Sequence, residues 1–189
     1  MSKSPGQVRI IGGQWRSRRL RFPQIEGLRP SPDAVRETLF NWLQQDISGS
    51  RCLDLYAGSG ALGFEAASRN ASSVTMVEKN PAVIRQLRRN CDLLNAVKVI
   101  EIIQSAAEGY LKTCESSFDI IFMDPPFGSK DLEKICVAIV ESSVIAPDTL
   151  IYIESARSTE PLPIPSSWHI IRQKTRGLVQ STLIKATSL

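Results

Sequence analysis

The residues best suited to chemistry in this sequence are Asp124, Pro125, Pro126 and Phe127, which follow the apolar run 118–123. A carboxylate at Asp124 can accept a hydrogen bond from an exocyclic amine, and the Pro125 carbonyl adds an acceptor in a turn that proline stiffens. A planar base can stack on Phe127, which contributes about 1–3 kcal/mol. The four residues therefore suit a base that carries an NH2 group. Taken alone, a Pro-Pro turn with a capping aspartate explains them equally well.

A glycine-rich segment forms a second group of candidate residues. Gly58, Gly60 and Gly63 lie where a predicted strand becomes a predicted helix. Glycine lets the backbone turn tightly and approach a ligand closely, and this strand–turn–helix context is typical of nucleotide binding. Glu78 ends the next predicted strand, where an acid hydrogen-bonds ribose hydroxyls. A turn that serves packing alone is the alternative.

Asp54 bears on which cofactor this segment binds. The glycine pattern with Glu78 also fits an NAD(P)-dependent oxidoreductase. A carboxylate four residues before Gly58 is an unexpected neighbour for a pyrophosphate, because like charges repel. It suits a ligand with a cationic group, such as the amino-acid end of S-adenosylmethionine. We therefore expect S-adenosyl-L-methionine as the cofactor.

Other kinds of site lack the residues they need. Cys52, Cys91, Cys114 and Cys136 form no CxxC pair, and His169 is the single histidine, so we expect free thiols and no metal site. One histidine in a predicted late strand also makes a Ser-His-Asp triad improbable. No apolar run approaches the ~18 residues of a membrane span. We expect a cytoplasmic protein that has no membrane partner.

Strands and helices alternate along most of the chain. The predicted strands are 51–56, 73–78, 97–103, 118–123, 149–153, 168–174 and 178–186, and the helices between them are 61–69, 81–95, 106–114 and 131–143. Such alternation predicts an α/β fold with a doubly wound, mostly parallel, seven-stranded sheet. Ser31 or Asp33 is expected to cap a further helix over 34–45. Glu154, at the end of the fifth strand, either faces the ligand edge of the sheet or closes a turn, and we favour the turn.

The positive charge is concentrated at the N-terminus. The net charge is +4, from 23 basic and 19 acidic residues, and residues 1–36 hold eight basic residues against two acidic ones. Such asymmetry suggests an anionic partner, with nucleic acid first and a membrane surface second, and a merely solubilising arm is the alternative. Runs 8–11 and 15–22 around Gly12 and Gly13 predict a basic β-hairpin. We divide the chain into an RNA-binding extension, 1–30, and a catalytic domain, 31–189.

Several segments together resemble one family. DLYAGSGALG at 54–63, VEK at 77–79 and DPPF at 124–127 resemble the class I S-adenosylmethionine-dependent methyltransferases, Rossmann-like enzymes that modify amino groups of bases. VRIIGGQWRSRRL at 8–20 and LRPSPDAVRETLFNWL at 28–43 are similar to the RsmD family, which methylates N2 of a guanine in small-subunit ribosomal RNA. The resemblance extends from about residue 8 to residue 185. It implies in-line methyl transfer to that amine, on free RNA or on the assembled small subunit. No surplus apolar stripe is visible in the sequence, so we expect a monomer.

The motifs, the basic hairpin and the resemblance together give a set of expected site residues. The expected catalytic residues are Asp124, Pro125, Pro126 and Phe127. The expected cofactor-binding residues are Asp54, Tyr56, Ala57, Gly58, Ser59, Gly60, Glu78, Lys79, Ser105, Ala106 and Asp124. The expected RNA-binding residues are Arg9, Arg16, Arg18, Arg19, Arg21, Arg29 and Arg36.

The chain departs from the family pattern at two places. Ser105 stands where related enzymes often place an Asp or Asn against the adenine amine, which puts that contact in doubt. Asp33-Ala34-Val35-Arg36-Glu37 replaces the frequent DRVRE, so one basic contact is missing.

Three other functions remain open from the sequence. DPPF also permits methylation of adenine N6 or cytosine N4 in DNA, although 189 residues leave no room for a separate DNA-recognition domain. A small NAD(P)-dependent oxidoreductase shares the glycine segment but leaves DPPF and the arginine-rich hairpin unexplained. A non-catalytic RNA-binding module would not need Asp54, the glycines and Asp124.

Overall fold

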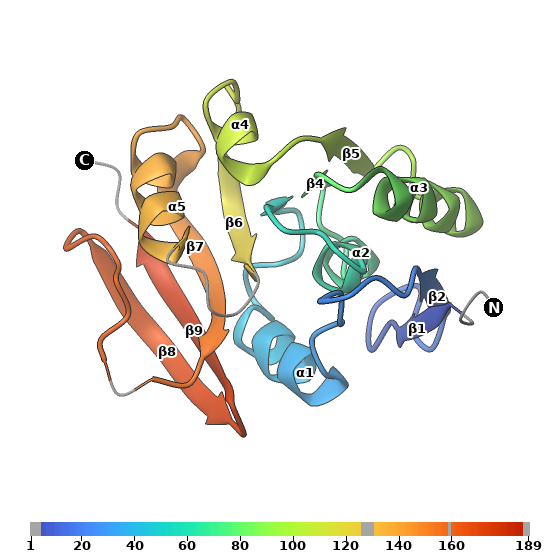
Figure 1. Ribbon diagram of the computed structural model, residues 1–189, viewed down its shortest axis with the longest axis horizontal. Coiled ribbons are helices and arrows are strands. Elements are labelled where there is room, and N and C mark those ends of the chain that lie inside the picture. The colour runs from blue at the N-terminus through green and yellow to red at the C-terminus, as the bar shows by residue number, and fades with distance from the viewer. Residues whose placement is uncertain (1–4, 126–130, 159, 187–189) are drawn as a thin grey trace.

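The computed structural model describes residues 5–125, 131–158 and 160–186. Seven strands form one sheet in the order β5-β4-β3-β6-β7-β9-β8 (Figure 1). Neighbours from β5 to β7 pair in parallel, whereas β9 is antiparallel to both β7 and β8. This confirms the predicted doubly wound sheet. The strands are β3 (Arg51–Asp54), β4 (Ser73–Glu78), β5 (Ile100–Gln104), β6 (Phe118–Met123), β7 (Ile145–Ala156), β8 (Trp168–Arg176) and β9 (Val179–Ala186).

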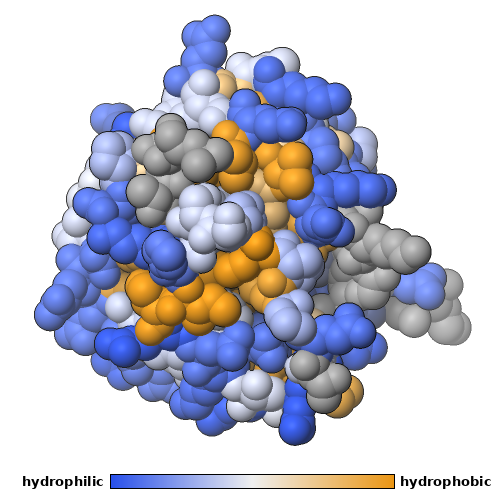
Figure 2. All heavy atoms as spheres, turned by 90° about the vertical axis from the view of Figure 1, so that its left-hand side faces the viewer, coloured by the Kyte–Doolittle hydropathy of each residue, from blue (hydrophilic) through white to orange (hydrophobic). Residues whose placement is uncertain are grey.

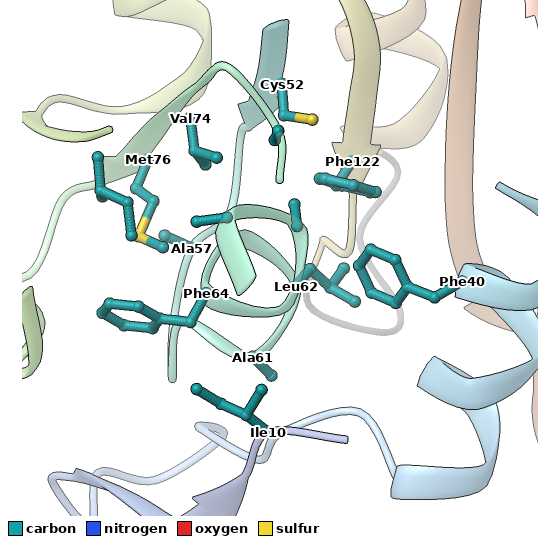
Figure 3. Packing of buried hydrophobic residues seen from close by; sticks show 14 of the residues in the cluster. Ile10, Phe40, Cys52, Ala57, Ala61, Leu62, Phe64, Val74, Met76 and Phe122 are labelled. Carbon is teal, nitrogen blue, oxygen red and sulfur yellow. The ribbon is translucent and has the colours of Figure 1, made fainter. Parts of the chain in front are cut away.

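Helices cover both faces of the sheet. Side chains of α1, α2 and α3 pack into one apolar cluster, and side chains of α4 and α5 pack into the other. Figure 3 shows the first cluster, where Leu62 and Phe64 of α2 lie among Phe40, Phe122 and Met76 from neighbouring elements. The helices are α1 (Asp33–Trp42), α2 (Ala61–Ser68), α3 (Pro81–Leu94), α4 (Ala107–Leu111) and α5 (Asp131–Val140).

β7 is longer than the sequence predicts, because pairing with β6 already begins at Ile145. The register shifts between Phe118 and Ile120, and the Thr149 hydroxyl donates a hydrogen bond to the Phe118 carbonyl at 2.7 Å across this irregularity. A side chain thus satisfies a backbone acceptor where the regular ladder is interrupted. A pattern of apolar residues carries no signal for such a bulge.

The start of α1 differs from the prediction, whereas the start of α3 confirms it. Pro32 occupies the N-cap of α1 without a side-chain hydrogen bond, so the expected cap from Ser31 or Asp33 is wrong. Both side chains have other partners, which are described below. At α3, the Asn80 side chain accepts a hydrogen bond from the Ala82 amide at 2.9 Å, and Pro81 takes the first helical position.

The N-terminal segment forms the predicted hairpin, but with a longer connection. Strands β1 (Gly6–Arg9) and β2 (Arg19–Phe22) pair antiparallel and enclose residues 10–18. Leu20 and Phe22 are buried, whereas Arg19 and Arg21 between them are exposed. Alternation along β2 therefore fixes the hairpin on the core and turns its arginines to solvent.

The connection between β1 and β2 docks on α2. The buried Glu65 carboxylate accepts hydrogen bonds from the amides of Ile11 at 2.7 Å and Gly12 at 2.8 Å. Gly13 has φ +74°, and a Cβ there would lie 1.8 Å from the Ser68 carbonyl oxygen. The hairpin shares its apolar core with α2 and α3. The domain boundary at residue 30 stays a prediction.

The described part of the chain contains no helix that is long and apolar enough to cross a membrane. All four cysteines are free, and Cys52, Cys91 and Cys136 are buried, whereas Cys114 is only partly so. Among the residues that the structure describes, no cluster of His, Cys, Asp and Glu is arranged to hold a metal ion.

Candidate active site

The candidate site lies where the strand order of the sheet reverses direction. β3 pairs with β4 on one side and with β6 on the other, and β7 follows β6. Because β3 and β6 are parallel neighbours, the segment after Asp54 and the segment after Met123 leave the same edge of the sheet. Ligands of open α/β sheets bind at such a switch point. The two groups of residues found in the sequence are therefore brought together.

Asp54 is a buried carboxylate at the base of the glycine segment. Its Oδ2 accepts a hydrogen bond from the Gly63 amide at 3.1 Å, and its Oδ1 has no hydrogen-bond partner among the described residues. Burial raises the pKa of Asp54 to about 7, although the Gly63 amide acts in the opposite direction. A buried carboxylate with an unused oxygen suits a cationic group on a ligand.

The glycine segment needs glycine at Gly60. This residue has φ +78°, and a Cβ there would lie 2.5 Å from the Phe64 ring. Gly58 has φ +49°, and its amide donates a hydrogen bond to Glu78 Oε2 at 3.0 Å. The Asn80 amide donates to Oε1 of the same carboxylate at 2.7 Å. Glu78 thus joins the glycine segment to the end of β4, and its contact with ribose stays a prediction.

The other expected cofactor residues follow the ends of β3, β4 and β5. Tyr56 is half-buried, Ala57 and Ser59 are buried, and Lys79 is exposed. The Ser105 hydroxyl donates to the Ala106 carbonyl at 2.9 Å, directly before α4. Glu78 pairs with Gln104 across β4 and β5, so Ser105 lies beside the Glu78 end of the site.

Asp124 receives a hydrogen bond that the sequence did not suggest. The Ser31 hydroxyl donates to Asp124 Oδ2 at 3.2 Å, from the segment that precedes α1. Desolvation raises the pKa of Asp124 well above its usual range, the nearby Glu154 carboxylate raises it further, and Ser31 opposes both. Pro125 is buried. The expected contributions of Pro126 and Phe127 lie outside the described residues.

Glu154 is a functional candidate for which the sequence left two alternatives open, the ligand edge of the sheet and a turn. The expected turn is wrong, because β7 continues through Glu154 to Ala156, paired with β9. Met123 pairs with Ile153, so Glu154 lies next to Asp124 in the sheet. A signal was present in the sequence, because Asp54, Glu78 and Glu154 all end apolar runs that form parallel strands.

A hydrogen-bond chain fixes the Glu154 side chain. The Tyr152 hydroxyl lies 3.1 Å from Glu154 Oε2 and 3.1 Å from the Ser181 hydroxyl on β9. Glu154 is 3% exposed, and burial raises its pKa. Asp124 and Glu154 are thus two desolvated carboxyl groups side by side, and their mutual repulsion favours a state in which one of them is protonated.

The segment before α1 covers the glycine segment as well. A Cβ at Gly58 would lie 3.1 Å from the Leu28 side chain. Three residues later, Ser31 reaches Asp124. The segment 28–31, between the hairpin and α1, therefore lies against both halves of the site.

The predicted RNA-binding arginines divide into two groups. Arg9 is exposed and pairs with Asp33 at 2.8 Å. Arg36 is 1% exposed and bonds to the Ser31 and Arg9 carbonyls, Asp33 and Glu65, so its expected RNA contact is corrected to a structural one. A buried guanidinium satisfied by four partners cannot reach a phosphate. The arginines that are exposed and form no ion pair with a described residue are Arg16, Arg18, Arg19, Arg21 and Arg29.

Comparison with known proteins agrees with this geometry. A family model described as "Conserved hypothetical protein 95" matches residues 8–185. A Haemophilus influenzae protein named "Ribosomal RNA small subunit methyltransferase D" is 42% identical over 181 residues, which cover 94% of this chain and 93% of the relative. The Escherichia coli K12 protein of the same name is 43% identical, covering 92% of this chain and 87% of the relative. The chain belongs to this RsmD family.

Solved structures extend the RsmD comparison to three dimensions. The putative methyltransferase yhhF from Escherichia coli superposes with a TM-score of 0.90 at 41% identity, covering 97% of this chain and all of that one. A putative methyltransferase, SMU.776, solved with S-adenosylhomocysteine, has a TM-score of 0.75 at 14% identity and shares the fold. The Rossmann-like class I methyltransferase fold expected from the sequence is confirmed.

Proposed function

We propose that this protein transfers a methyl group from S-adenosyl-L-methionine to the N2 amine of a guanine in small-subunit ribosomal RNA. The observation that carries the proposal is the meeting of the Asp54–glycine segment with Asp124 at the neighbouring ends of β3 and β6. Membership of the RsmD family adds the substrate class, because the two relatives above are named for small-subunit ribosomal RNA.

The residues at the glycine segment fit this cofactor. Asp54 Oδ1, which has no hydrogen-bond partner within the described part of the chain, offers a buried negative charge to the amino-acid end. Gly58 and Gly60 leave the backbone beside it without side chains. Glu78 presents its carboxylate at the end of β4, toward ribose hydroxyls. When bound, S-adenosyl-L-methionine supplies an electrophilic methyl group.

Asp124 orients the amine for in-line attack. Ser31 binds Oδ2, which leaves Oδ1 to accept an N–H of the base, and the Pro125 carbonyl is a second acceptor for the other N–H. These bonds return electron density to a nitrogen whose lone pair is delocalised into the ring. Correct alignment of two reactants can supply about 7–11 kcal/mol of the barrier.

The raised pKa of Asp124 suits its second task. As the new N–C bond forms, the amine nitrogen becomes positive and its proton becomes acidic. A desolvated carboxylate beside Glu154 is a stronger base than a solvated one, so Asp124 can receive this proton. Ser31 opposes this rise of the Asp124 pKa by donating to the carboxylate, which favours the ionised form.

The experiment that tests the proposal supplies radiolabelled S-adenosylmethionine with three substrates in parallel. These are free small-subunit ribosomal RNA, small subunits from cells that lack the endogenous activity, and duplex DNA. Chromatography of the digested product identifies the labelled nucleoside. Asp124→Ala is the inactive control, and its thermal midpoint shows whether the fold is retained.

Label in N2-methylguanosine that is lost in Asp124→Ala supports the proposal. Label at adenine N6 or cytosine N4 of DNA would show that DNA is the substrate, and it would still support S-adenosyl-L-methionine as the cofactor. Binding of a nicotinamide cofactor without binding of S-adenosylhomocysteine would overturn the proposal altogether.

A further inference from the structure

A second basic group lies near the C-terminus. Residues 155–189 contain five basic residues and one acidic residue, whereas residues 37–154 contain ten basic and sixteen acidic ones. The positive charge of the chain is therefore divided between its two ends, with an acidic centre. The hairpin accounts for only the first group.

Three of these C-terminal charges form a row on β8. Arg172, Lys174 and Arg176 stand at alternate positions of this edge strand and pair with Leu183, Ser181 and Val179 of β9. Alternate residues point to one face of a sheet. All three are exposed, and none forms an ion pair with any residue that the structure describes. We call them the β8 basic row.

The row is on the same face as the catalytic carboxylate. Met123 pairs with Ile153, Glu154 pairs with Ser181, and Ser181 pairs with Lys174, so Asp124, Glu154, Ser181 and Lys174 lie side by side across four strands. The Tyr152 hydroxyl, which contacts both Glu154 and Ser181, marks the same face. Strand spacing places the Lys174 backbone about 14 Å from that of Asp124.

The β8 basic row and the hairpin lie on opposite sides of the site. Figure 1 places β1 and β2 at the right of the molecule and β8 at the left, with α1 between them. Figure 2 shows that the β8 side is mostly hydrophilic around a smaller hydrophobic area. Ile170 and Ile171, at the other end of β8, are exposed apolar residues on this strand.

We propose that Arg172, Lys174 and Arg176 on β8 form a second RNA-binding surface that holds the backbone on the far side of the target base from the hairpin. This inference rests on the proposed function. A base inserted at Asp124 has RNA on both sides of it, and the hairpin can contact only one of them. The β8 basic row is on the same face of the sheet as Asp124, and its Lys174 backbone lies about 14 Å from that of Asp124. Positive side chains at this place suit the phosphates of the other side.

Protection of a sheet edge is the competing explanation for charges on β8. Lysine and arginine on an edge strand discourage pairing with other chains. That role needs charge on the strand but not on one particular face. Gln173 and Thr175, which alternate with the residues of the β8 basic row, point to the opposite face of the sheet and are uncharged. The one-sided arrangement toward the site favours RNA binding.

The test removes the two charges nearest to the site with Lys174→Gln/Arg176→Gln. A matched control, Lys98→Gln/Lys112→Gln, removes two exposed charges flanking β5 and α4, away from β8. Methylation kinetics on the ribosomal RNA or subunit that the wild-type protein modifies are measured over a series of salt concentrations. Binding of S-adenosylhomocysteine and the thermal midpoint verify the fold of both variants.

The expected result is a higher KM with unchanged kcat for the β8 variant. The slope of log RNA affinity against log salt should become shallower by about 0.7–0.9 for each phosphate that the variant no longer neutralises. The charge-preserving Lys174→Arg/Arg176→Lys should restore the wild-type slope. A β8 variant whose slope and KM match those of the wild type and the control overturns the second surface while leaving the methyltransferase function intact. A wild-type protein that methylates no RNA overturns both.

Discussion

The Ser31 hydroxyl donates a hydrogen bond to Asp124 Oδ2 at 3.2 Å, linking the segment before α1 to the catalytic end of β6. The two residues are 93 positions apart. Ser31 is thereby a positioning residue, since it fixes one oxygen of the carboxylate that holds the target amine. Its neighbour in sequence, Pro32, is the N-cap of α1, so the orientation of Ser31 depends on the packing of that helix.

Replacement of Ser31 by Ala should move the acidic limb of the pH–rate profile to higher pH. The hydroxyl stabilises the ionised form of Asp124 and so lowers its pKa, against the effects of desolvation and Glu154. Loss of a hydrogen bond to a charged group costs about 1.5–3 kcal/mol, which corresponds to a movement of about one pH unit or more. The measurement is kcat/KM against pH. Ser31→Thr keeps a hydroxyl and should retain the wild-type limb, whereas an unmoved limb in Ser31→Ala would show that the bond does not affect Asp124.

Replacement of Glu154 by Gln should move the same limb in the opposite direction. The Glu154 carboxylate raises the pKa of Asp124 by like-charge repulsion, so its removal lets Asp124 ionise at lower pH. Asp54 also raises the pKa of Asp124 and remains, so the shift should be partial. Glu141→Gln removes an exposed acid at the end of α5 and serves as the control. Identical pH–rate profiles for Glu154→Gln and Glu141→Gln would show that Glu154 does not affect the pKa of Asp124.

Replacement of Gly60 by Ala should impair both folding and cofactor binding. A non-glycine residue at φ +78° costs about 1–2 kcal/mol, and the added methyl group would also displace Phe64 and Leu87. Gly177→Ala, in the β8–β9 turn, carries the backbone cost alone, because φ is +60° there and no atom lies within 4 Å of the new Cβ. Urea unfolding should show a larger loss for Gly60→Ala. Equal losses in the two variants would mean that the glycine segment tolerates a side chain.

Replacement of Arg16, Arg18, Arg19 and Arg21 by Ala should weaken RNA binding and leave binding of S-adenosylhomocysteine unchanged. All four side chains are exposed, and the apolar residues that hold the hairpin on the core are untouched. The slope of log affinity against log salt should become shallower by about 0.7–0.9 for each phosphate that these arginines neutralise in the wild type. An unchanged slope would exclude the four arginines from the RNA interface.

Local patterns determined the elements and the two motifs of this protein. Alternating strands and helices, glycines after a strand and Asn80-Pro81 before α3 are preferences of neighbouring residues, so they are visible in the sequence. Because parallel strands end at the same edge of a sheet, the alternation of strands and helices also implies a common edge for Asp54 and Asp124. Other residues at or near the site, by contrast, acquire their partners from distant segments. Ser31 binds Asp124, Glu154 lies beside it, and Glu65 joins Arg36 and the hairpin amides.

Only the tertiary structure decided between two possible roles for Ser31, Arg36 and Glu154. From the sequence, Ser31 could cap a helix, Arg36 could bind a phosphate and Glu154 could close a turn. Each of these residue types is equally suited to either role when its neighbours in sequence are the only information. The packing of α1 on the sheet buries Arg36 and brings Ser31 to Asp124, and the register of β6 with β7 places Glu154 in the same row. Burial and register arise from contacts between segments that are far apart in the chain, so a reading of neighbouring residues cannot contain them.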